Sequence, residues 1–469
     1  MKRTYTLLTI GCGLLFAAST CFAQMYTVTD LRTFVGGTWS TASGINAYGQ
    51  VVGAASFADD ARGHPSYHAF RTAPNRPINS ATDDLGTLGG SLSWATGIDV
   101  SGQVVGWASS PKFLQEAFRT APNSSINPAT DALGTLDGTY SIAMGINKSG
   151  QVVGHSQHAF RTAPNSPINF ATDDLGTLGG SFSEANGIND SGEVVGASYD
   201  TDFIHAFRTA PNSPINPATD NLGGLTGIAW GINAFAQVVG YVYYPGWSNI
   251  HAFRTAPHRL INPATDDLGT LDPQNNQTFG LGSWAWNINA YGEVVGESAV
   301  STGGEPPFLY SGGVMHDLNE LVPVNSGWVI VGVAAINDRG QIAATGYRGG
   351  ESHAVLLNPV YKAYVQQPIN ADGSSVFKAK RGVIPIKFRL TQYDARTCAL
   401  VPASISVTRA AGGTLTTVNQ NTYGTETDFR ITGCQYHYNL EAKDLRIGVY
   451  RVDISIEGVF VGHAVFAIK

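Results

Sequence analysis

The chain has 469 residues, of which 13% are charged, and its formal net charge is −7 at pH 7. This mildly acidic balance excludes the broad basic face that binding to nucleic acid or anionic lipid requires. The 55 glycines, and many short β-rich segments between Gly, Pro, Asn and Asp, predict an all-β protein with two or three domains.

Residues 1–23 have the pattern of a secretory signal peptide. Lys2 and Arg3 precede an apolar run of about sixteen residues, which is too short to span a membrane, and Cys21–Ala23 resembles a cleavage site. Acylation of Cys21 is the alternative, but Ala18–Thr20 is a poor approach to such a cysteine. No later run of eighteen apolar residues follows, so we expect a secreted protein without a transmembrane segment.

Three short phrases each occur seven times between residues 25 and 358, and successive copies of the first are 42 to 56 residues apart. The first is GINxxGxVVG, which starts at Gly44, Gly97, Gly145, Gly187, Gly231, Asn287 and, in decayed form, Ala335. The second is HAFRT, which starts at His68, Glu116, His158, His205 and His251, with relatives at Pro307 and His353. The third is DLGTL or a relative of it, which starts at Asp30, Asp84, Ala132, Asp174, Asn221, Asp267 and Asp317.

Each unit predicts four short antiparallel strands. The Asn-x-x-Gly sequence inside GINxxGxVVG is typical of a tight hairpin turn. The prolines of the loop after HAFRT prevent the flanking strands from extending into that loop. Seven such units predict a seven-bladed β-propeller, with an irregular β-solenoid or sandwich array as the alternative. The first unit begins at Met25 with a DLGTL-type strand that lacks the three strands before it, and the last unit lacks a strand of this type. We therefore expect the strand at Met25 to complete the last unit and close the ring.

The combination of HAF, DLGTLGG and GINxxGxVVG closely resembles the probable extracellular repeats of the HAF family of bacterial exported proteins. The resemblance covers residues 25–358 and implies a secreted repeat protein without established catalytic residues. The near-identical APNSPINPATD loops belong to a segment that usually tolerates change, so they indicate either recent duplication or one binding surface used on several blades.

Residues 361–469 have a different composition and predict about seven alternating strands, which fits an immunoglobulin-like sandwich. Val383–Phe388 reads VIPIKF and resembles the PxKF motif of a bacterial extracellular domain, which implies an accessory or binding module. Cys398 and Cys434 remain after export and are expected to form a disulfide worth about 4 kcal/mol. Two free buried thiols are the alternative.

Few residues indicate catalysis or metal binding. The repeated histidines His68, His158, His205, His251 and His353 lie on separate units, so we expect each to bond to backbone within its own unit rather than to share a metal. Adjacent pairs such as Asp83-Asp84 point to opposite faces of a strand, which makes them a poor acid–base pair and typical of a turn. The catalytic and phosphate-binding motifs that we sought are missing, and we predict no metal and no cofactor.

The segment before each GIN is the best candidate for a binding surface. An alanine is constant there, whereas its neighbours vary and include Trp94, Trp230, Trp284 and Trp286. In a propeller this segment enters the innermost strand near the channel, where indole rings stack on sugar faces or on a partner's apolar side chains. Packing between blades is the alternative interpretation of these residues.

We therefore expect a secreted, non-catalytic binding or surface-interaction protein. Its expected partner is an extracellular glycan or a cell-surface protein, bound through propeller loops, and no oligomeric state is predicted. The alternatives are a secreted propeller hydrolase or lyase acting on polysaccharide, and a structural matrix or spacer protein.

Overall fold

The computed structural model describes residues 26–469 apart from 59–65, 114, 245–249, 273–281, 371–373, 379–381, 393–394, 399–400, 402, 412–413, 423–428, 443–444 and 457–458. The predicted signal peptide, residues 1–23, lies outside these described residues. The described chain is all-β, with one short helix, α1 (Leu318–Leu321), and one 3-10 turn at Val324–Ser326. None of its described helices has the length and apolar character that crossing a membrane takes.

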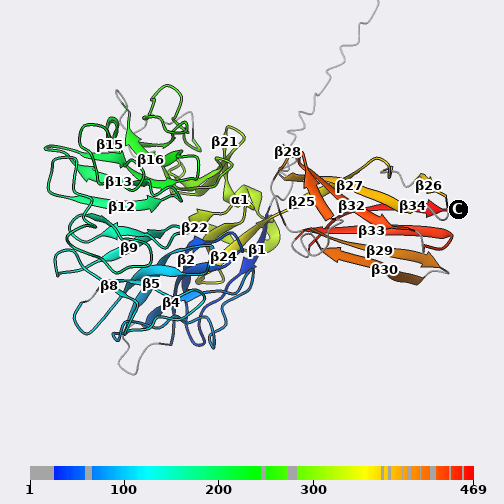
Figure 1. Ribbon diagram of the computed structural model, residues 1–469, viewed down its shortest axis with the longest axis horizontal. Helices are drawn as coiled ribbons and strands as arrows, with labels where there is room; N and C mark the ends of the chain where they lie inside the picture. Colours follow the sequence, from blue (N-terminus) through cyan, green and yellow to red (C-terminus); the bar gives the residue numbers. More distant parts are fainter. Residues whose placement is uncertain are drawn as a thin grey trace, which may run out of the picture.

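Residues 26–359 form seven antiparallel units, one for each GIN phrase, in which the strands pair mostly in chain order (Figure 1). Units 1 to 3 contain β2 (Ser40–Ile45), β3 (Val51–Ser56) and β4 (Tyr67–Arg71); β5 (Ser93–Ile98), β6 (Val104–Ala108), β7 (Glu116–Arg119) and β8 (Ala132–Gly134); and β9 (Ile142–Ile146), β10 (Val152–His155) and β11 (Ala159–Arg161). Units 4 and 5 contain β12 (Ser183–Ile188), β13 (Val194–Tyr199) and β14 (Ile204–Arg208), then β15 (Asn221–Ile232), which belongs to both, β16 (Val238–Tyr243) and β17 (Ile250–Arg254). Units 6 and 7 contain β18 (Ser283–Ile288), β19 (Val294–Ser298), β20 (Pro307–Ser311) and β21 (Val314–Asp317), then β22 (Val329–Ile336), β23 (Ile342–Arg348) and β24 (Glu351–Pro359).

The fourth strand of the unit is shorter than the sequence predicted. In units 1, 3 and 5 the DLGTL segment makes only one isolated bridge, for example between Phe70 and Asp84. The reason is local, because the Asp84 carboxylate accepts the N–H of Gly86 at 2.8 Å and Gly86 has a φ of +71°. A positive φ ends the extended conformation two residues after the bridge.

The N-terminal strand β1 (Tyr26–Asp30) pairs with β24 of unit 7, as the sequence predicted. The antiparallel register runs from Tyr26 opposite Pro359 to Asp30 opposite Val355. The Tyr26 side chain is fully buried, and its hydroxyl donates to the carbonyl of Gly340 at 3.1 Å. The two ends of the repeat region are therefore joined in one four-stranded sheet.

Each unit packs its face against the next unit through a shared apolar cluster. Val52 of unit 1 lies in one cluster with Val104 and Phe118 of unit 2, and comparable clusters join the following pairs. The series returns to its start, because Leu356 of unit 7 shares a cluster with Val51 of unit 1. Burial on both faces explains why the Val-Val pair after each turn is apolar at both positions.

The first strands of the units, which we call the inner strands, also contact one another in succession, and β22 contacts β2. At their ends the Asn of each GIN phrase donates its side-chain amide to the backbone carbonyl of the corresponding residue in the next unit. These bonds link Asn46 to Asp99, Asn147 to Asn189, Asn189 to Asn233, Asn233 to Asn289, Asn289 to Asn337, and Asn337 to Asn46, at 3.0 to 3.4 Å. The link from unit 2 is missing because Asp99, a carboxylate, replaces the Asn and cannot donate.

The repeated Pro-rich loop fastens each unit to the one before it. In unit 2, Asn123 has a φ of +53°, and its side-chain oxygen accepts from Gln50 of unit 1 at 3.2 Å. The N–H of Ile126 donates to the carbonyl of Leu85 at 2.8 Å, and the Ile126 side chain is 8% exposed. The same contacts recur in the other loops, so the expectation that this segment tolerates change is wrong for its Asn and Ile positions.

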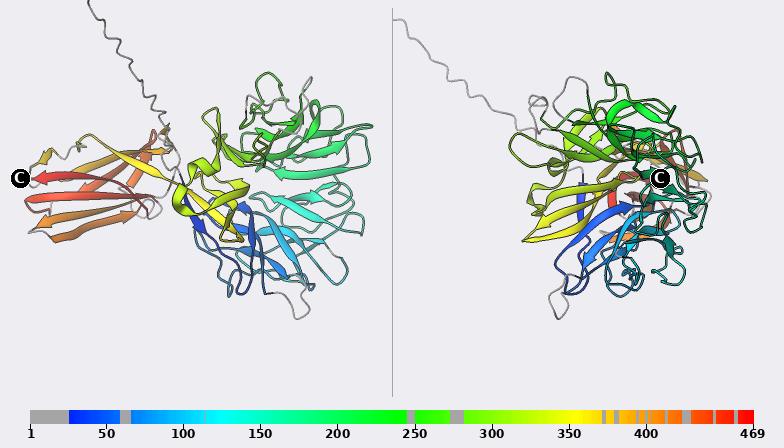
Figure 2. Two further views of the ribbon diagram at one scale, coloured as in Figure 1. Left: turned by 180° about the vertical axis from the view of Figure 1, so that it is seen from behind. Right: turned by 90° about the vertical axis from the view of Figure 1, so that its left-hand side faces the viewer.

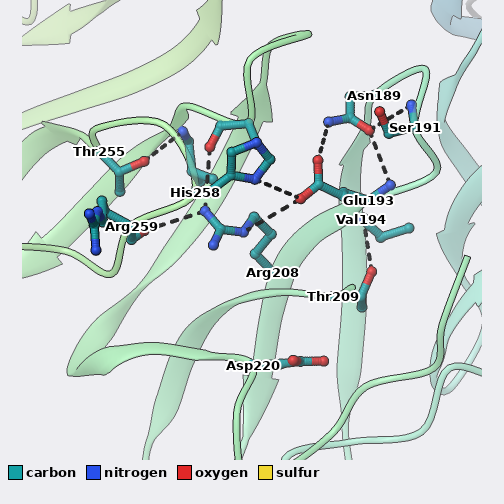
Figure 3. Close-up of polar contacts among 12 residues, drawn as sticks. Asn189, Ser191, Glu193, Val194, Arg208, Thr209, Asp220, Thr255, His258 and Arg259 are labelled. Atoms are coloured by element: carbon teal, nitrogen blue, oxygen red, sulfur yellow. Dashed lines mark hydrogen bonds and ion pairs between the residues drawn. The ribbon is translucent and has the colours of Figure 1, made fainter. Parts of the chain in front are cut away.

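One junction uses different residues for the same contact (Figure 3). Glu193 of unit 4 replaces the Gln, and His258 of the unit 5 loop replaces the Asn. The Glu193 carboxylate lies 3.6 Å from the imidazole of His258 and 3.9 Å from the guanidinium of Arg208. The neutral hydrogen bond becomes a charged contact at this junction.

Residues 361–468 form two sheets around a separate core, and Figure 2 shows them beside the repeat units. Phe388 stacks on Tyr436 at 4.8 Å, and Tyr450 stacks on Phe466 at 5.4 Å within this core. One sheet contains β25 (Tyr361–Gln366), β27 (Val383–Gln392), β28 (Ala395–Arg396), β31 (Phe429–Thr432) and β32 (Gln435–Glu441). The other contains β26 (Ser375–Phe377), β29 (Ala403–Ala411), β30 (Thr414–Thr422), β33 (Gly448–Ile456) and β34 (Val459–Ile468).

The structure shows where the two cysteines and the VIPIKF stretch of this region lie. Cys398 and Cys434 form a disulfide, as predicted. Pro385 of the VIPIKF stretch lies in β27 opposite Asn439 of β32, beyond the part of β27 that pairs with β25. A proline lacks the N–H that pairing on a second side would need, which explains its position.

Candidate functional site

The variable residues of the inner strands lie at a β-bulge. In unit 2 the register with β6 shifts between Ala95 and Gly97, so Thr96 is the extra residue. Opposite the bulge, a Cβ built on Gly106 would lie 2.0 Å from the carbonyl oxygen of Trp94, so this position needs glycine. The bulge explains why the Gly of Val-Val-Gly is constant. It also explains why the extra residue of the bulge, which has no cross-strand partner, varies between units.

Trp94 belongs to an aromatic group formed by units 1 and 2. Its ring centroid lies 6.2 Å from that of Trp39 and 5.9 Å from that of Tyr67, and its indole N–H donates to Ser43 at 3.0 Å. The side chain is half-buried. Trp94 therefore packs between units while part of its ring stays accessible.

Trp284 and Trp286 of unit 6 contact Glu297, and Trp230 of unit 5 contacts Trp286. Trp230 and Trp286 are bulge residues whose rings meet edge to face, with centroids 5.4 Å apart. Trp284 is the cross-strand partner of Glu297, and the Trp286 indole donates a hydrogen bond to the Glu297 carboxylate. The indole nitrogen of Trp230 is buried and has no partner among the described residues.

Glu297 lines a cavity of about 520 Å³ together with Glu305, Val331 and the turn at residues 299–304. Burial raises the pKa of Glu297, the charge of Glu305 raises it further, and the bonds from Trp286 and from the backbone of Val333 oppose the shift. The cavity lining supplies two carboxylates as acceptors, and the Trp286 indole, which is not part of the lining, bonds to one of them. Carboxylates accept from the hydroxyls of a polyhydroxylated ligand, and indole rings cover its apolar faces.

The sequence did not single out Glu297 and Glu305. Glu297 follows Val-Val-Gly, at a position occupied by Ala54, Trp107, His155, Ala197, Tyr241 and Thr345 in the other units. The variation at this second position is the feature of the sequence that could have indicated Glu297.

A second carboxyl group lies on the inner strand of unit 4. Burial raises the pKa of Glu184, and the hydrogen bond from Asn186 at 3.4 Å opposes this shift. The pKa values of Tyr140 and Tyr241 are raised by burial and by the charge of Glu184, which places both phenols near it. Acidic and aromatic side chains therefore occur at more than one point around the inner strands.

The repeated histidines are structural, but the partner of four of them differs from the expected backbone group. His68, His158, His251 and His353 bond through Nδ1 to the Asp that begins DLGTL, at 2.9 to 3.1 Å. Unit 4 carries Asn221 in place of that Asp, and His205 bonds to a backbone carbonyl, that of Leu225, and to Asp200. Within the described ranges, no group of three His, Cys, Asp or Glu side chains is arranged to hold a metal.

Comparison with known proteins finds no matching family and no matching curated protein. Among solved structures, an alkylpurine DNA glycosylase AlkC of Pseudomonas fluorescens bound to abasic DNA aligns at 14% identity over 23% of this chain and 30% of that one, with a TM-score of 0.15. A prolyl endopeptidase aligns at 12% identity over 92% of this chain and 55% of that one (TM-score 0.31), and a polysaccharide lyase at 9% over 95% and 47% (TM-score 0.13). The chain thus covers between 30% and 55% of each of these structures, and likenesses this weak support no conclusion about fold or function.

Proposed function

We propose that this chain is an exported, non-catalytic binding protein that recognises extracellular glycan through the cavity at Glu297 and its neighbouring tryptophans. The observation that carries the proposal is a cavity of about 520 Å³ lined by Glu297 and Glu305, in which the Glu297 carboxylate bonds to the Trp286 indole and lies opposite Trp284 on the paired strand. Cavities of this size accommodate small ligands, and indole rings supply the flat apolar surface that sugar rings stack on.

The proposal includes the architecture of a seven-bladed β-propeller of HAF-type repeats followed by a PxKF-type, immunoglobulin-like domain. Its support is the unbroken series of contacts in which every unit packs on the next and unit 7 packs on unit 1. A ring of this kind leaves few open strand edges, which suits a secreted protein that meets other chains. Export itself is tested by sequencing the N-terminus of the secreted chain, which is expected to begin at Gln24.

Binding of the secreted chain to a broad glycan array tests the function. We expect at least one class of neutral oligosaccharide to bind, and Glu297→Gln and Trp286→Ala to weaken it at least tenfold. Trp94→Ala is the informative comparison, because Trp94 belongs to a separate aromatic group. Loss of binding in Trp94→Ala as well extends the site to unit 2, whereas unchanged binding in all three variants contradicts the proposal.

The pair Glu297 and Glu305 also favours one alternative, a polysaccharide hydrolase. A carboxyl group with a raised pKa beside a second carboxylate is the arrangement of a general acid and its partner. Incubation of bound oligosaccharides with the protein, followed by assay of new reducing ends, separates the two functions. Turnover that disappears in Glu297→Gln replaces the binding function with a hydrolytic one.

A further inference from the structure

The turns at the far ends of the inner strands surround a second cavity, of about 330 Å³, on the axis of the repeat region. Its lining includes five isoleucines of the GIN phrases, which we call its floor, Asn side chains of four GIN phrases, and the residue after the Asn or Asp in every unit except unit 6. The five isoleucines are Ile45, Ile98, Ile146, Ile188 and Ile232. Trp94 and Trp284 precede the isoleucine of their own GIN phrase by four residues, so the tryptophans lie toward the opposite end of the strands. The axial cavity is thus separate from the cavity at Glu297.

The residue after each Asn presents a backbone N–H toward the next unit. In unit 3 the N–H of Lys148 donates to the carboxylate of Asp190 in unit 4 at 3.1 Å. In unit 6 the N–H of Ala290 donates to Asp338 of unit 7 at 2.8 Å. An aspartate at this position of one unit therefore accepts the N–H of the unit before it.

The other five N–H groups of the ring have no acceptor within the described chain, because the next unit carries Ala, Val or Lys instead of Asp. They belong to Ala47, Val100, Asp190, Ala234 and Asp338, all of which line the cavity. All five residues are exposed, so these N–H groups are accessible to a hydrogen-bond acceptor that enters the cavity. The two aspartates already show that an oxygen fits there.

The charges and the isoleucines that line the cavity restrict the chemical class of ligand that it can bind. Asp99, Asp190 and Asp338 line the cavity with Lys148 as the one cation among the lining residues, which opposes an anionic ligand. The isoleucine floor favours an apolar group at the bottom. A neutral group that joins a carbonyl oxygen to a methyl meets both demands, and this is the acetamido group of an N-acetylhexosamine.

We propose that the axial cavity binds the end of a glycan chain through an N-acetylated sugar. The acetamido carbonyl accepts from one or two of the unpaired N–H groups, and its methyl contacts the isoleucines. Tyr48, Phe235 and Tyr291, which follow on the same turns and are 51 to 57% exposed, offer stacking surfaces for the next sugars. This inference deepens the proposed glycan binding and rests on it, but it uses a different set of residues.

The chain itself supplies a graded series of variants. Val100→Asn, Ala234→Asn and Ala290→Asn combined place neutral acceptors where Asp190 and Asp338 stand in their own units, and leave two N–H groups unpaired. Asp190→Ala with Asp338→Ala frees both occupied groups and leaves seven unpaired. The wild type, with five, lies between them, and the repeat already tolerates an acceptor at this position.

The test is calorimetric titration of the full chain and these variants with the N-acetylglucosamine trimer, and with the fully deacetylated glucosamine trimer as the matched probe. We expect the acetylated trimer to bind the wild type, at least tenfold more weakly the triple Asn variant, and more tightly the double Ala variant. The deacetylated trimer is expected not to bind at this site, because it lacks the acetamido group.

Glu297→Gln separates this inference from the proposed function. Retained binding of the acetylated trimer in Glu297→Gln, with loss in the triple Asn variant, assigns the trimer to the axial cavity. Loss in Glu297→Gln with full binding in the triple Asn variant overturns the axial site while the proposed function stands. Absence of acetylated-trimer binding in the wild type also overturns the axial site, and the glycan array then judges the other cavity by itself.

Discussion

Within one repeat unit, the loop after HAFRT is nearly constant between copies, whereas the inner strand changes at two positions in most copies. The loop is the more exposed of the two, yet its Asn and Ile contact the preceding unit, as Asn123 contacts Gln50 and Ile126 contacts Leu85. The inner strand contacts the inner strands of the neighbouring units, and its bulge residue meets a backbone carbonyl in one unit and an aromatic ring in another, as Thr96 and Trp230 do.

The difference teaches that constancy in this chain follows contacts between units rather than burial. Every loop must fit the same place on the unit before it, so duplication and geometry favour the same residues. Residues at the bulge meet the next unit in more than one way, because Thr96 and Asn186 donate to the carbonyl of an alanine there, whereas Trp230 contacts the Trp286 ring. The variable inner strands and the axial turns are therefore the surfaces on which a specific ligand site can differ between units.

The largest expected effect comes from breaking the closure that the constant residues support. Tyr26→Ala removes a fully buried ring from the junction of β1 and β24 and is expected to cost about 3–5 kcal/mol of unfolding free energy. Thr27→Ala on the same strand changes an exposed side chain and is the control. Urea unfolding of both variants measures the difference, and equal stabilities would contradict a role for β1 in closing the repeat region.

The comparison between loop positions is sharpened by two substitutions in neighbouring loops. Ile215→Ala removes a side chain that is 7% exposed and is expected to cost about 2–4 kcal/mol, because it leaves a cavity between units. Phe170→Ala changes a loop side chain that is 77% exposed and is expected to stay within about 0.5 kcal/mol of the wild type. Similar losses in both would mean that the loop is uniformly important, against the contacts described above.

The sequence predicted what repeats locally, namely the strands, the hairpin turns and the pairing of residues 26–30 with the last unit. It did not predict contacts between units, such as the bond from Gln50 to Asn123 across 73 residues, because periodicity does not show which faces meet. The His68–Asp84 pair lies within one unit, and it was not predicted because the sequence does not show whether the imidazole bonds to backbone or to a side chain. The cavity at Glu297 is lined by residues of unit 6 and by Val331 of unit 7, so only the assembled structure shows it.

A smaller effect is expected where a carboxylate replaces the usual Gln after the turn. Burial raises the pKa of Glu293 above the ordinary 4.5, Asp338 raises it further, and bonds from Asn289 and Ser311 oppose the shift. A raised pKa in the folded state contributes stability at low pH that is lost as pH rises through the folded pKa.

Glu293→Gln removes this dependence and restores the residue that five other units carry. The variant is expected to match the wild type near pH 4 and to become more stable than it as pH rises. Thermal unfolding of both proteins between pH 4 and pH 8 measures the change, with Gln237→Glu as the reverse substitution. A constant difference across this range would show that the Glu293 carboxyl does not set it.

The smallest net effect is expected from exchanging the charged junction for the neutral one (Figure 3). Glu193→Gln with His258→Asn recreates the pair formed by Gln50 and Asn123, so the double variant is expected within about 0.5 kcal/mol of the wild type. His258→Asn alone opposes an amide oxygen to the buried Glu193 carboxylate and is expected to cost about 1 kcal/mol. A double-mutant cycle by urea unfolding at pH 7 isolates the coupling. If the single effects simply add, the two residues do not replace each other's partner, and the junction at unit 4 is stabilised by Arg208 rather than by the exchange of Gln and Asn for Glu and His.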